Sequence, residues 1–304
     1  MDYKTAGVNV EANATWVAKL QEMAGISNDF AGKFPLRGAT LVASADGVGS
    51  KTKLAYNLGK LDTIGIDLVA MNVNDIAASH AIPLFFLDYI GVHSIDQDAL
   101  QEIMTGIIEG CSQAGCKLLG GETAEIPITY PPDDASLAGF AVGLVTPTQE
   151  EDAKEGDLII GYPSSGLHSN GFTLIHQLIK DKSLTLSDDL LDPTIIYSDI
   201  IRHAHIFIKK AAHITGGGLK ENISRVLDGA VIYPSQWKES RASIFDVLEH
   251  ILPEEELYKT FNMGIGFVVI IEKMNKDTIF KLTSQFNPIV IGEVRGNSIY
   301  IFGE

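Results

Sequence analysis

The chain has 304 residues, of which 45% are hydrophobic and 20% are charged, and its formal net charge is -16. This balance is typical of a packed globular protein and excludes a disordered or fibrous one, and the negative charge argues against general nucleic-acid binding, which needs a basic surface. Since the sequence shows neither a leader pattern nor an apolar run of ~18 residues, we expect a cytoplasmic protein with no membrane partner.

The length favours two domains, because single cores stop growing well before this size. Residues 146–157 (TPTQEEDAKEGD) are polar and charged and show no apolar period, which is typical of a linker. We therefore expect one domain at residues 1–150 and a second at residues 151–304.

The first half predicts alternating strands and helices. Residues 39–45 (ATLVASA) form a short apolar run that ends in a glycine-rich turn, which indicates a buried strand. Residues 65–81 favour a helix that carries Asp67 and Asp75 near one face. The elements predicted after it are a strand at 84–92, an amphipathic helix at 98–115, and strands at 117–119 and 136–145.

The second half restarts the pattern, so both halves are predicted to be α+β. Cys111 and Cys116 lack the second pair that a zinc site needs, and we expect them to be small core residues. The elements predicted in the second half are a strand at 158–161, helices from Phe172 and Leu219, and strands near Val231, at 266–271 and at 289–294.

The segment ADGVGSK, residues 45–51, follows the first predicted strand. Gly47 and Gly49 free its backbone to approach a phosphate, and Asp46 lies on the turn. It is not a Walker A motif, because Ser50 separates Gly49 from Lys51. The alternative is a tight turn without a ligand.

Several carboxylates accompany this loop, and GGETAE at residues 120–125 repeats its layout of two glycines and an acid after a strand. Mg²⁺ takes one or two protein carboxylates and leaves its other positions to phosphates and water. A charge inside the apolar run LFFLDY is costly unless it is paired. The candidate acids are Asp46, Asp67, Asp75, Asp88 and Glu122.

Two further glycine-containing loops lie in the second half. In SSGLHSNG, residues 164–171, Ser169 and Asn170 are natural N-caps for the next helix, and His168 is either a ligand contact or an ordinary surface residue. In ITGGG, the residues Thr215–Gly218 precede a helix and favour a phosphate site, the alternative being a flexible lead-in.

Taken together, these strings resemble the phosphoribosylformylglycinamidine cyclo-ligase family in order and spacing from about Tyr3 to Phe267. The most specific is DTIGIDLVAMNVNDI; the others are ADGVGSK, PLFFLDY, GCKLLGGETAE, HSNG, TGGG and TFNMGIGF. The resemblance implies a homodimer whose N-terminal halves build a β-barrel at the interface, with an α+β second domain closing over the site. It also implies ATP and Mg²⁺ as cofactors and formylglycinamidine ribonucleotide as the substrate.

The resemblance implies residue roles as well. Asp46, Asp75 and Glu122 would bind the metal, and His168, Lys51 and Asp88 would be catalytic. ATP would be bound by Asp46, Gly47, Gly49, Ser50, Lys51, Asp67 and Asp75, and the substrate or its phosphate by Ser169, Asn170, Thr215, Gly216, Gly217 and Gly218.

The sequence departs from the family pattern at Ala45 and Ser50, where threonine is expected, and at Leu167, where proline is usual. Related ATP-dependent proteins remain as alternatives, above all thiamine monophosphate kinase. A non-catalytic nucleotide-binding subunit is a further alternative, although several carboxylates on separate loops repel one another without a cation.

Overall fold

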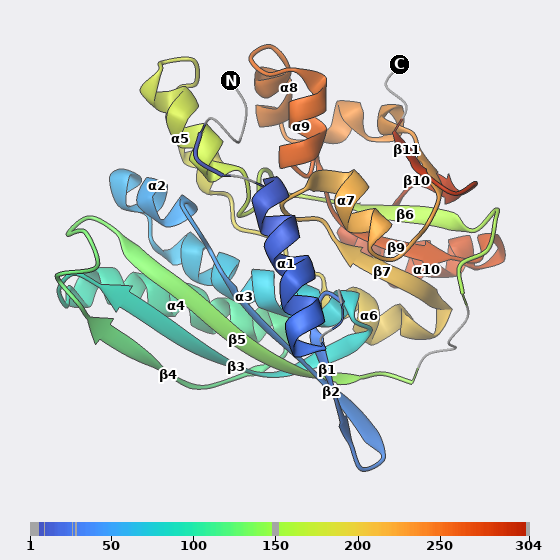
Figure 1. Ribbon diagram of the computed structural model, residues 1–304, viewed down its shortest axis with the longest axis horizontal. Helices are drawn as coiled ribbons and strands as arrows, with labels where there is room; N and C mark the ends of the chain where they lie inside the picture. The colour runs from blue at the N-terminus through green and yellow to red at the C-terminus, as the bar shows by residue number, and fades with distance from the viewer. Residues whose placement is uncertain (1–5, 9, 26, 28, 148–151, 302–304) are drawn as a thin grey trace.

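The computed structural model describes residues 6–8, 10–25, 27, 29–147 and 152–301, and its strands form two sheets (Figure 1). Within the first half of this described chain, a five-stranded sheet has the order β1-β2-β5-β3-β4. All neighbouring strands in it are antiparallel except β3 and β4. The strands are β1 (Gly32–Leu36), β2 (Ala39–Gly47), β3 (Ala81–Val92), β4 (Lys117–Glu125) and β5 (Ala135–Val145).

Helices cover one face of this sheet. In β5, buried and exposed residues alternate, so Leu137 and Ala141 face the helices while Phe140 and Leu144 face outward. Asp62–Ala78 (α3) is buried along most of its length, because it lies between this sheet and the second one. Its neighbours on the covered face are α2 (Lys51–Leu58) and α4 (Gln97–Ala114).

Glycines let α3 and α4 approach unusually closely. A Cβ added at Gly106 would lie 1.8 Å from the carbonyl oxygen of Asp62, and one at Gly65 would lie 2.2 Å from that of Ile103. The two backbones therefore touch at this crossing, where a side chain has no room. This contact helps to set the position of α3 on the sheet, and therefore the position of the carboxylates that α3 carries.

In the second half of the described chain, a six-stranded sheet has the order β11-β8-β10-β6-β9-β7. Every residue of Ile265–Ile271 (β9) is buried, as expected for an internal strand with elements on both faces. The other strands are β6 (Leu158–Pro163), β7 (Ile208–His213), β8 (Ala230–Ile232), β10 (Ile289–Val294) and β11 (Ile299–Ile301). The α-helices are α5 (Phe172–Lys180), α6 (Ser198–Ala204), α7 (Gly218–Ser224), α8 (Ile244–Glu249), α9 (Glu254–Thr260) and α10 (Lys276–Leu282).

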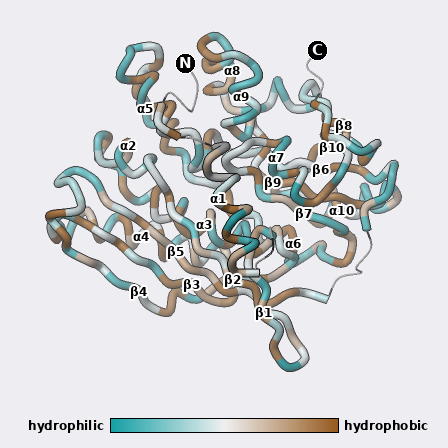
Figure 2. Tube along the Cα trace, viewed as in Figure 1, coloured by the Kyte–Doolittle hydropathy of each residue, from teal (hydrophilic) through white to brown (hydrophobic). Residues whose placement is uncertain are grey.

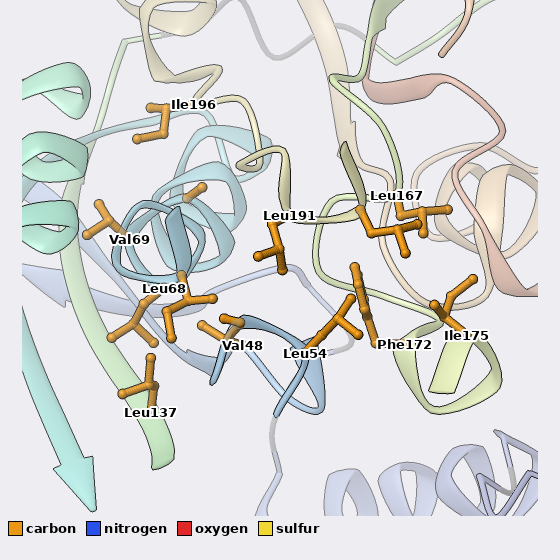
Figure 3. Packing of buried hydrophobic residues seen from close by; sticks show 14 of the residues in the cluster. Val48, Leu54, Leu68, Val69, Leu137, Leu167, Phe172, Ile175, Leu191 and Ile196 are labelled. Carbon is orange, nitrogen blue, oxygen red and sulfur yellow. The ribbon is translucent and has the colours of Figure 1, made fainter. Parts of the chain in front are cut away.

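One hydrophobic cluster joins the two halves. Figure 3 shows Val48 and Leu54 packed toward Phe172, with Leu167 and Leu191 beside them. The apolar segments in Figure 2 likewise concentrate in the strands and in α3 rather than at the loop tips. The loop that follows β2 and the loop that precedes α5 are therefore held together by burial of apolar surface from both halves.

Several helices and strands of the structure were not predicted from the sequence. An N-terminal helix, α1 (Val10–Ala24), occupies the stretch interpreted only as polar, and the other elements that were not predicted are β1, α2, α6, β7, α8, α9, α10 and β11. Within the described chain the first sheet is open, with β1 and β4 as its two edges. The barrel expected between two chains at a dimer interface stays a prediction. Among the described residues, we find no helix with the length and apolarity needed to span a membrane.

Candidate functional site

Two loops that are far apart in sequence line one pocket of about 310 Å³. The residues from Asp46 to Ser50 come from the end of β2, and those from Ser169 to Thr173 come from the start of α5. Ligand contacts were predicted for each loop from its own sequence motif, and the structure places the two loops at the same cavity. Its lining is rich in glycine and hydroxyl groups, which suits a phosphorylated ligand.

Hydrogen bonds join the two loops that line the pocket. The hydroxyl oxygens of Ser50 and Thr173 are 3.1 Å apart, and a ring nitrogen of His176 lies 2.8 Å from the carbonyl oxygen of Ser50. Gly171 has a φ of +82°, and a Cβ there would lie 2.2 Å from the ring of Phe261. Glycine at 171 is thus required both by the backbone conformation and by packing.

This helix start differs from the predicted one. Gly171, not Ser169 or Asn170, is the N-cap residue of α5, and no side chain caps it. The hydroxyl of Ser169 instead lies 3.0 Å from that of Thr194, in the loop before α6. Ser169 and Asn170 both line the pocket.

Asp46 lines this pocket and is electrostatically coupled to Asp75 on α3, which lies outside the lining. The Asp46 backbone exchanges two hydrogen bonds with the amide of Asn72, at 2.9 and 3.2 Å, which ties the end of β2 to α3. Burial and the charge of Asp75 raise the pKa of Asp46 to about 6. Two carboxylates that repel each other favour a cation between them.

His213, at the end of β7, binds Asp75 from the second sheet. Its Nδ1 is 2.9 Å from Asp75 Oδ1, and the Ser44 hydroxyl is 3.4 Å from Asp75 Oδ2. Asn74, the residue before Asp75 on α3, donates to the carbonyl oxygen of Ile195 and accepts from the N–H of Tyr197. The carboxylate end of α3 is thus anchored to both halves of the chain.

Lys51 and Asp67 form a fully buried ion pair, 2.7 Å apart. The Lys51 ammonium also donates to the carbonyl oxygen of Asp192, and Asp67 Oδ1 accepts from the N–H and hydroxyl of Thr194, at 2.8 and 2.6 Å. The Lys51 side chain lies outside the pocket lining. Its geometry therefore favours holding the loop at 192–194 against α3 rather than contacting a phosphate.

His168 is buried with a φ of +61°. Its Nε2 accepts a hydrogen bond from the N–H of Ser165, at 3.3 Å, which places the ring proton on Nδ1. Nδ1 is buried and has no partner among the described residues. Burial, together with the nearby charges of His213 and Lys51, lowers the pKa of His168 well below its usual value. A neutral ring with a free N–H can donate to a ligand but carries no positive charge.

Two protein-family models match the chain. The model of the AIR synthase related protein N-terminal domain matches residues 29–145, and that of the C-terminal domain matches residues 154–302. The chain is 44% identical over 294 residues to the chloroplastic phosphoribosylformylglycinamidine cyclo-ligase of Arabidopsis thaliana, covering 89% of this chain and 75% of the relative. It is 42% identical to the cyclo-ligase of Parasynechococcus marenigrum, covering 90% and 89%. The chain belongs to the phosphoribosylformylglycinamidine cyclo-ligase family.

Solved structures with lower identity share the fold. The thiamine monophosphate kinase of Aquifex aeolicus superposes with a TM-score of 0.69 at 15% identity, over 98% of this chain and 99% of that one. A hydrogenase maturation protein HypE in complex with ATP gives 0.64 at 16% identity, over 91% and 85%. At these identities the likeness shows a common architecture alone.

Glu122 does not join Asp46 and Asp75 in this cyclo-ligase family member. A Cβ at Gly121 would meet the Asp88 side chain on the helix-covered face, so the neighbouring Glu122 points to the opposite, exposed face of β4. Among the described residues, no group of three His, Cys, Asp or Glu side chains is arranged to hold a metal. Asp88 lies beneath Gly121, outside the pocket lining, and burial raises its pKa.

The TGGG loop also lies outside the pocket lining, and two of its three glycines have conformational and packing reasons, whereas a Cβ at Gly216 would meet nothing within 4 Å. Gly217 has a φ of +90°, and a Cβ at Gly218 would lie 2.0 Å from the carbonyl oxygen of Tyr258. The Asn222 amide donates to the carbonyl oxygens of Gly216 and Gly218, at 3.2 and 2.8 Å. The loop follows His213 directly, which places it beside the Asp75 end of the site.

Sequence reasoning missed His213, Asn72, Asn74 and Thr194. The two asparagines carried a usable signal: they lie just before Asp75 in the apolar second half of the helix, and a polar side chain in such a segment needs a specific partner. His213 precedes the TGGG loop, but no local pattern links it to a carboxylate 138 residues away.

Proposed function

We propose that this chain is an ATP-dependent phosphoribosylformylglycinamidine cyclo-ligase, which converts formylglycinamidine ribonucleotide to 5-aminoimidazole ribonucleotide with release of ADP and phosphate. The observation that carries this proposal is the 44% identity to a curated cyclo-ligase over most of both chains. The pocket between the Asp46 and Ser169 loops supports it, because residues of two of the resembling motifs, ADGVGSK and HSNG, line that cavity together.

The proposed chemistry requires activation of a poor leaving group. An amide oxygen does not leave readily, so the γ-phosphoryl group of ATP is transferred to the formyl amide oxygen, and the amidine nitrogen then attacks the same carbon and expels phosphate. Both groups belong to one bound molecule, so holding them in attack geometry supplies much of the rate. The protein must also stabilise the charge that moves with the phosphoryl group.

Mg²⁺ fits at Asp46 and Asp75. Burial, and after it the charge of Asp75, raises the pKa of Asp46, and a divalent cation would relieve the part that comes from repulsion between the two carboxylates. When bound, the metal would neutralise charge on the ATP phosphates. Two carboxylates also match the preference of Mg²⁺ for few protein ligands, with phosphates and water as the rest. His213 would orient Asp75 through its 2.9 Å contact.

The remaining roles follow from where each side chain lies. Gly47, Gly49, Ser50 and Asn170 line the pocket and are proposed phosphate contacts. His168 lies next to the pocket-lining Ser169 but outside the lining itself, and we propose that its buried, unpartnered Nδ1–H donates to the bound substrate. Lys51 and Asp67 are proposed to position the loop at 192–194, and we assign no direct contact to Asp88 or to Glu122 within one chain.

We further propose a cytoplasmic homodimer whose sheets pair through their uncovered faces to complete a barrel, with domains at residues 1–150 and 151–304. The outward face of β5 carries Phe140, 40% exposed, and Leu144, which pair across the sheet with Leu87 and Ile82 of β3. Exposed apolar surface of this kind marks an association site. The variant Phe140→Glu should convert the dimer to a monomer in light-scattering measurements.

A steady-state assay with formylglycinamidine ribonucleotide, ATP and Mg²⁺ tests the function. We expect ADP and 5-aminoimidazole ribonucleotide to appear in equal amounts. ADP formed only with another substrate, such as thiamine monophosphate, would replace the proposal with a kinase activity. Folded protein that binds ATP without releasing ADP would indicate a non-catalytic subunit.

A further inference from the structure

The end of α4 brings the two cysteines of this chain together. The N–H of Cys116 donates to the carbonyl oxygen of Cys111 at 3.0 Å, and the N–H of Gly115 donates to that of Ser112 at 3.1 Å. Gly115 has a φ of +64°. These two nested hydrogen bonds and the left-handed glycine define a Schellman motif, in which Cys111 and Cys116 occupy the two positions whose side chains contact each other.

This motif gives the geometry that a disulfide needs. Two cysteines can be bridged only if their Cα atoms lie within about 7 Å and their side chains converge. The 3.0 Å backbone hydrogen bond from Cys116 to Cys111 closes the chain on itself and satisfies the first condition, and the hydrogen bond between the two thiols satisfies the second. Both residues are free thiols in the structure.

The two thiols differ in exposure and in charge environment. Cys111 is 3% exposed and packs in the core, whereas Cys116 is partly exposed. A hydrogen bond from the Cys111 thiol lowers the pKa of Cys116, and Arg202 lowers it further. Arg202 is held at this corner by its 2.9 Å hydrogen bond to the carbonyl oxygen of Ala114. Cys116 is therefore the thiol that ionises and meets an oxidant first.

We propose that Cys116 and Cys111 form a reversible intrachain disulfide when the protein meets a peroxide. The Cys116 thiolate attacks one peroxide oxygen, the O–O bond breaks, and Cys116 becomes a sulfenic acid while the released hydroxide takes up a proton. The Cys111 sulfur then attacks the Cys116 sulfur. The S–O bond breaks, the Cys111 proton passes to the leaving hydroxide, and water is released. In sum, two thiols and one peroxide give one disulfide and two waters.

The test uses the full chain and hydrogen peroxide, followed by alkylation with N-ethylmaleimide and intact mass measurement. Since the chain has two cysteines in all, the readout has few states. We expect both alkylation sites to be lost together. The oxidised chain, which carries no N-ethylmaleimide, should be about 2 Da lighter than the reduced chain before alkylation, and dithiothreitol should restore both sites. A covalent dimer on non-reducing electrophoresis would contradict the proposal. So would a chain that keeps both thiols under conditions that oxidise free N-acetylcysteine.

Matched variants separate the attacking thiol from the resolving one. In Cys111→Ala, Cys116 should be captured by dimedone as a sulfenic acid, and it should advance to the sulfinic acid with prolonged exposure. In Cys116→Ala, the buried Cys111 should stay reduced. Equal oxidation of Cys111 in the presence and absence of Cys116 would overturn the assignment. Bridging of the wild-type chain should also be slower in guanidinium, because the Schellman motif is then lost; equal or faster bridging would remove the role of the fold.

Discussion

Lys51 and Asp67 meet in the interior of the molecule, 2.7 Å apart and without exposure to solvent. The pair joins the first turn of α2 to α3, and each partner also binds the segment at 192–194. Breaking one side of such a pair leaves a buried charge without compensation, which is far costlier than the pair is stabilising. The pair therefore controls how the second half docks beside the pocket.

The variant Lys51→Met should lower the free energy of unfolding by about 3–5 kcal/mol. Lys53→Met is the matched control, since Lys53 pairs with Asp133 near the surface and its loss should cost less than about 1 kcal/mol. Urea denaturation followed by circular dichroism measures both. A fully stable Lys51→Met chain that has lost only its turnover would instead return Lys51 to the catalytic role predicted from the sequence.

The sequence predicted the elements that have a clear apolar period, such as α4 and β5, and the loops that carry Asp46 and Ser169. It could not predict the role of His213 on β7, because the contact of His213 with a carboxylate on α3 depends on how the two halves of the chain dock. It also grouped Glu122 with Asp46 from a repeated loop motif. Motif likeness does not specify the face of a strand, and the alternation along β4 places Glu122 on the outer side.

Gly106→Ala should destabilise the protein by about 1–3 kcal/mol, although alanine favours helices over glycine. The added Cβ would lie 1.8 Å from the Asp62 carbonyl oxygen, so α3 and α4 must separate. Ser112→Ala, on an exposed position of the same helix, is the control and should change stability by less than about 0.5 kcal/mol. The midpoint of thermal unfolding distinguishes them, and equal midpoints would contradict the close crossing.

His80 should make the protein less stable in acid. Burial, followed by the charges of Lys210 and Lys33, lowers the pKa of His80 to about 4 from its usual 6.5. Between these values the unfolded chain binds a proton that the folded chain does not, so stability is lost as the pH falls from 6.5 toward 4. Over that range the loss due to His80 should be about 2–3 kcal/mol.

The variant His80→Asn keeps a side chain that tolerates the φ of +57° at this position and removes the titrating ring. Its free energy of unfolding should depend less steeply on pH between 6.5 and 4 than that of the wild type, in urea titrations at matched ionic strength. Parallel curves for the two proteins would show that His80 titrates normally.

Asp75→Asn should abolish Mg²⁺-dependent turnover while the fold persists, because it removes one of the two proposed metal ligands. His213→Gln should reduce turnover by roughly 10–100-fold, the usual cost of losing an outer partner of a metal ligand, and raising the Mg²⁺ concentration should recover part of it. Asp277→Asn, on the exposed first turn of α10, is the control. Wild-type turnover in Asp75→Asn would remove Asp75 from the metal site.

The most direct test of the proposed cyclo-ligase reaction follows the formyl oxygen. With formylglycinamidine ribonucleotide labelled with ¹⁸O in the formyl group, transfer of the γ-phosphoryl group to that oxygen predicts one ¹⁸O atom in each phosphate released, measured by mass spectrometry together with ADP and 5-aminoimidazole ribonucleotide. Unlabelled phosphate formed alongside ADP would show that water, not the formyl oxygen, receives the phosphoryl group, and would contradict the mechanism proposed for this site.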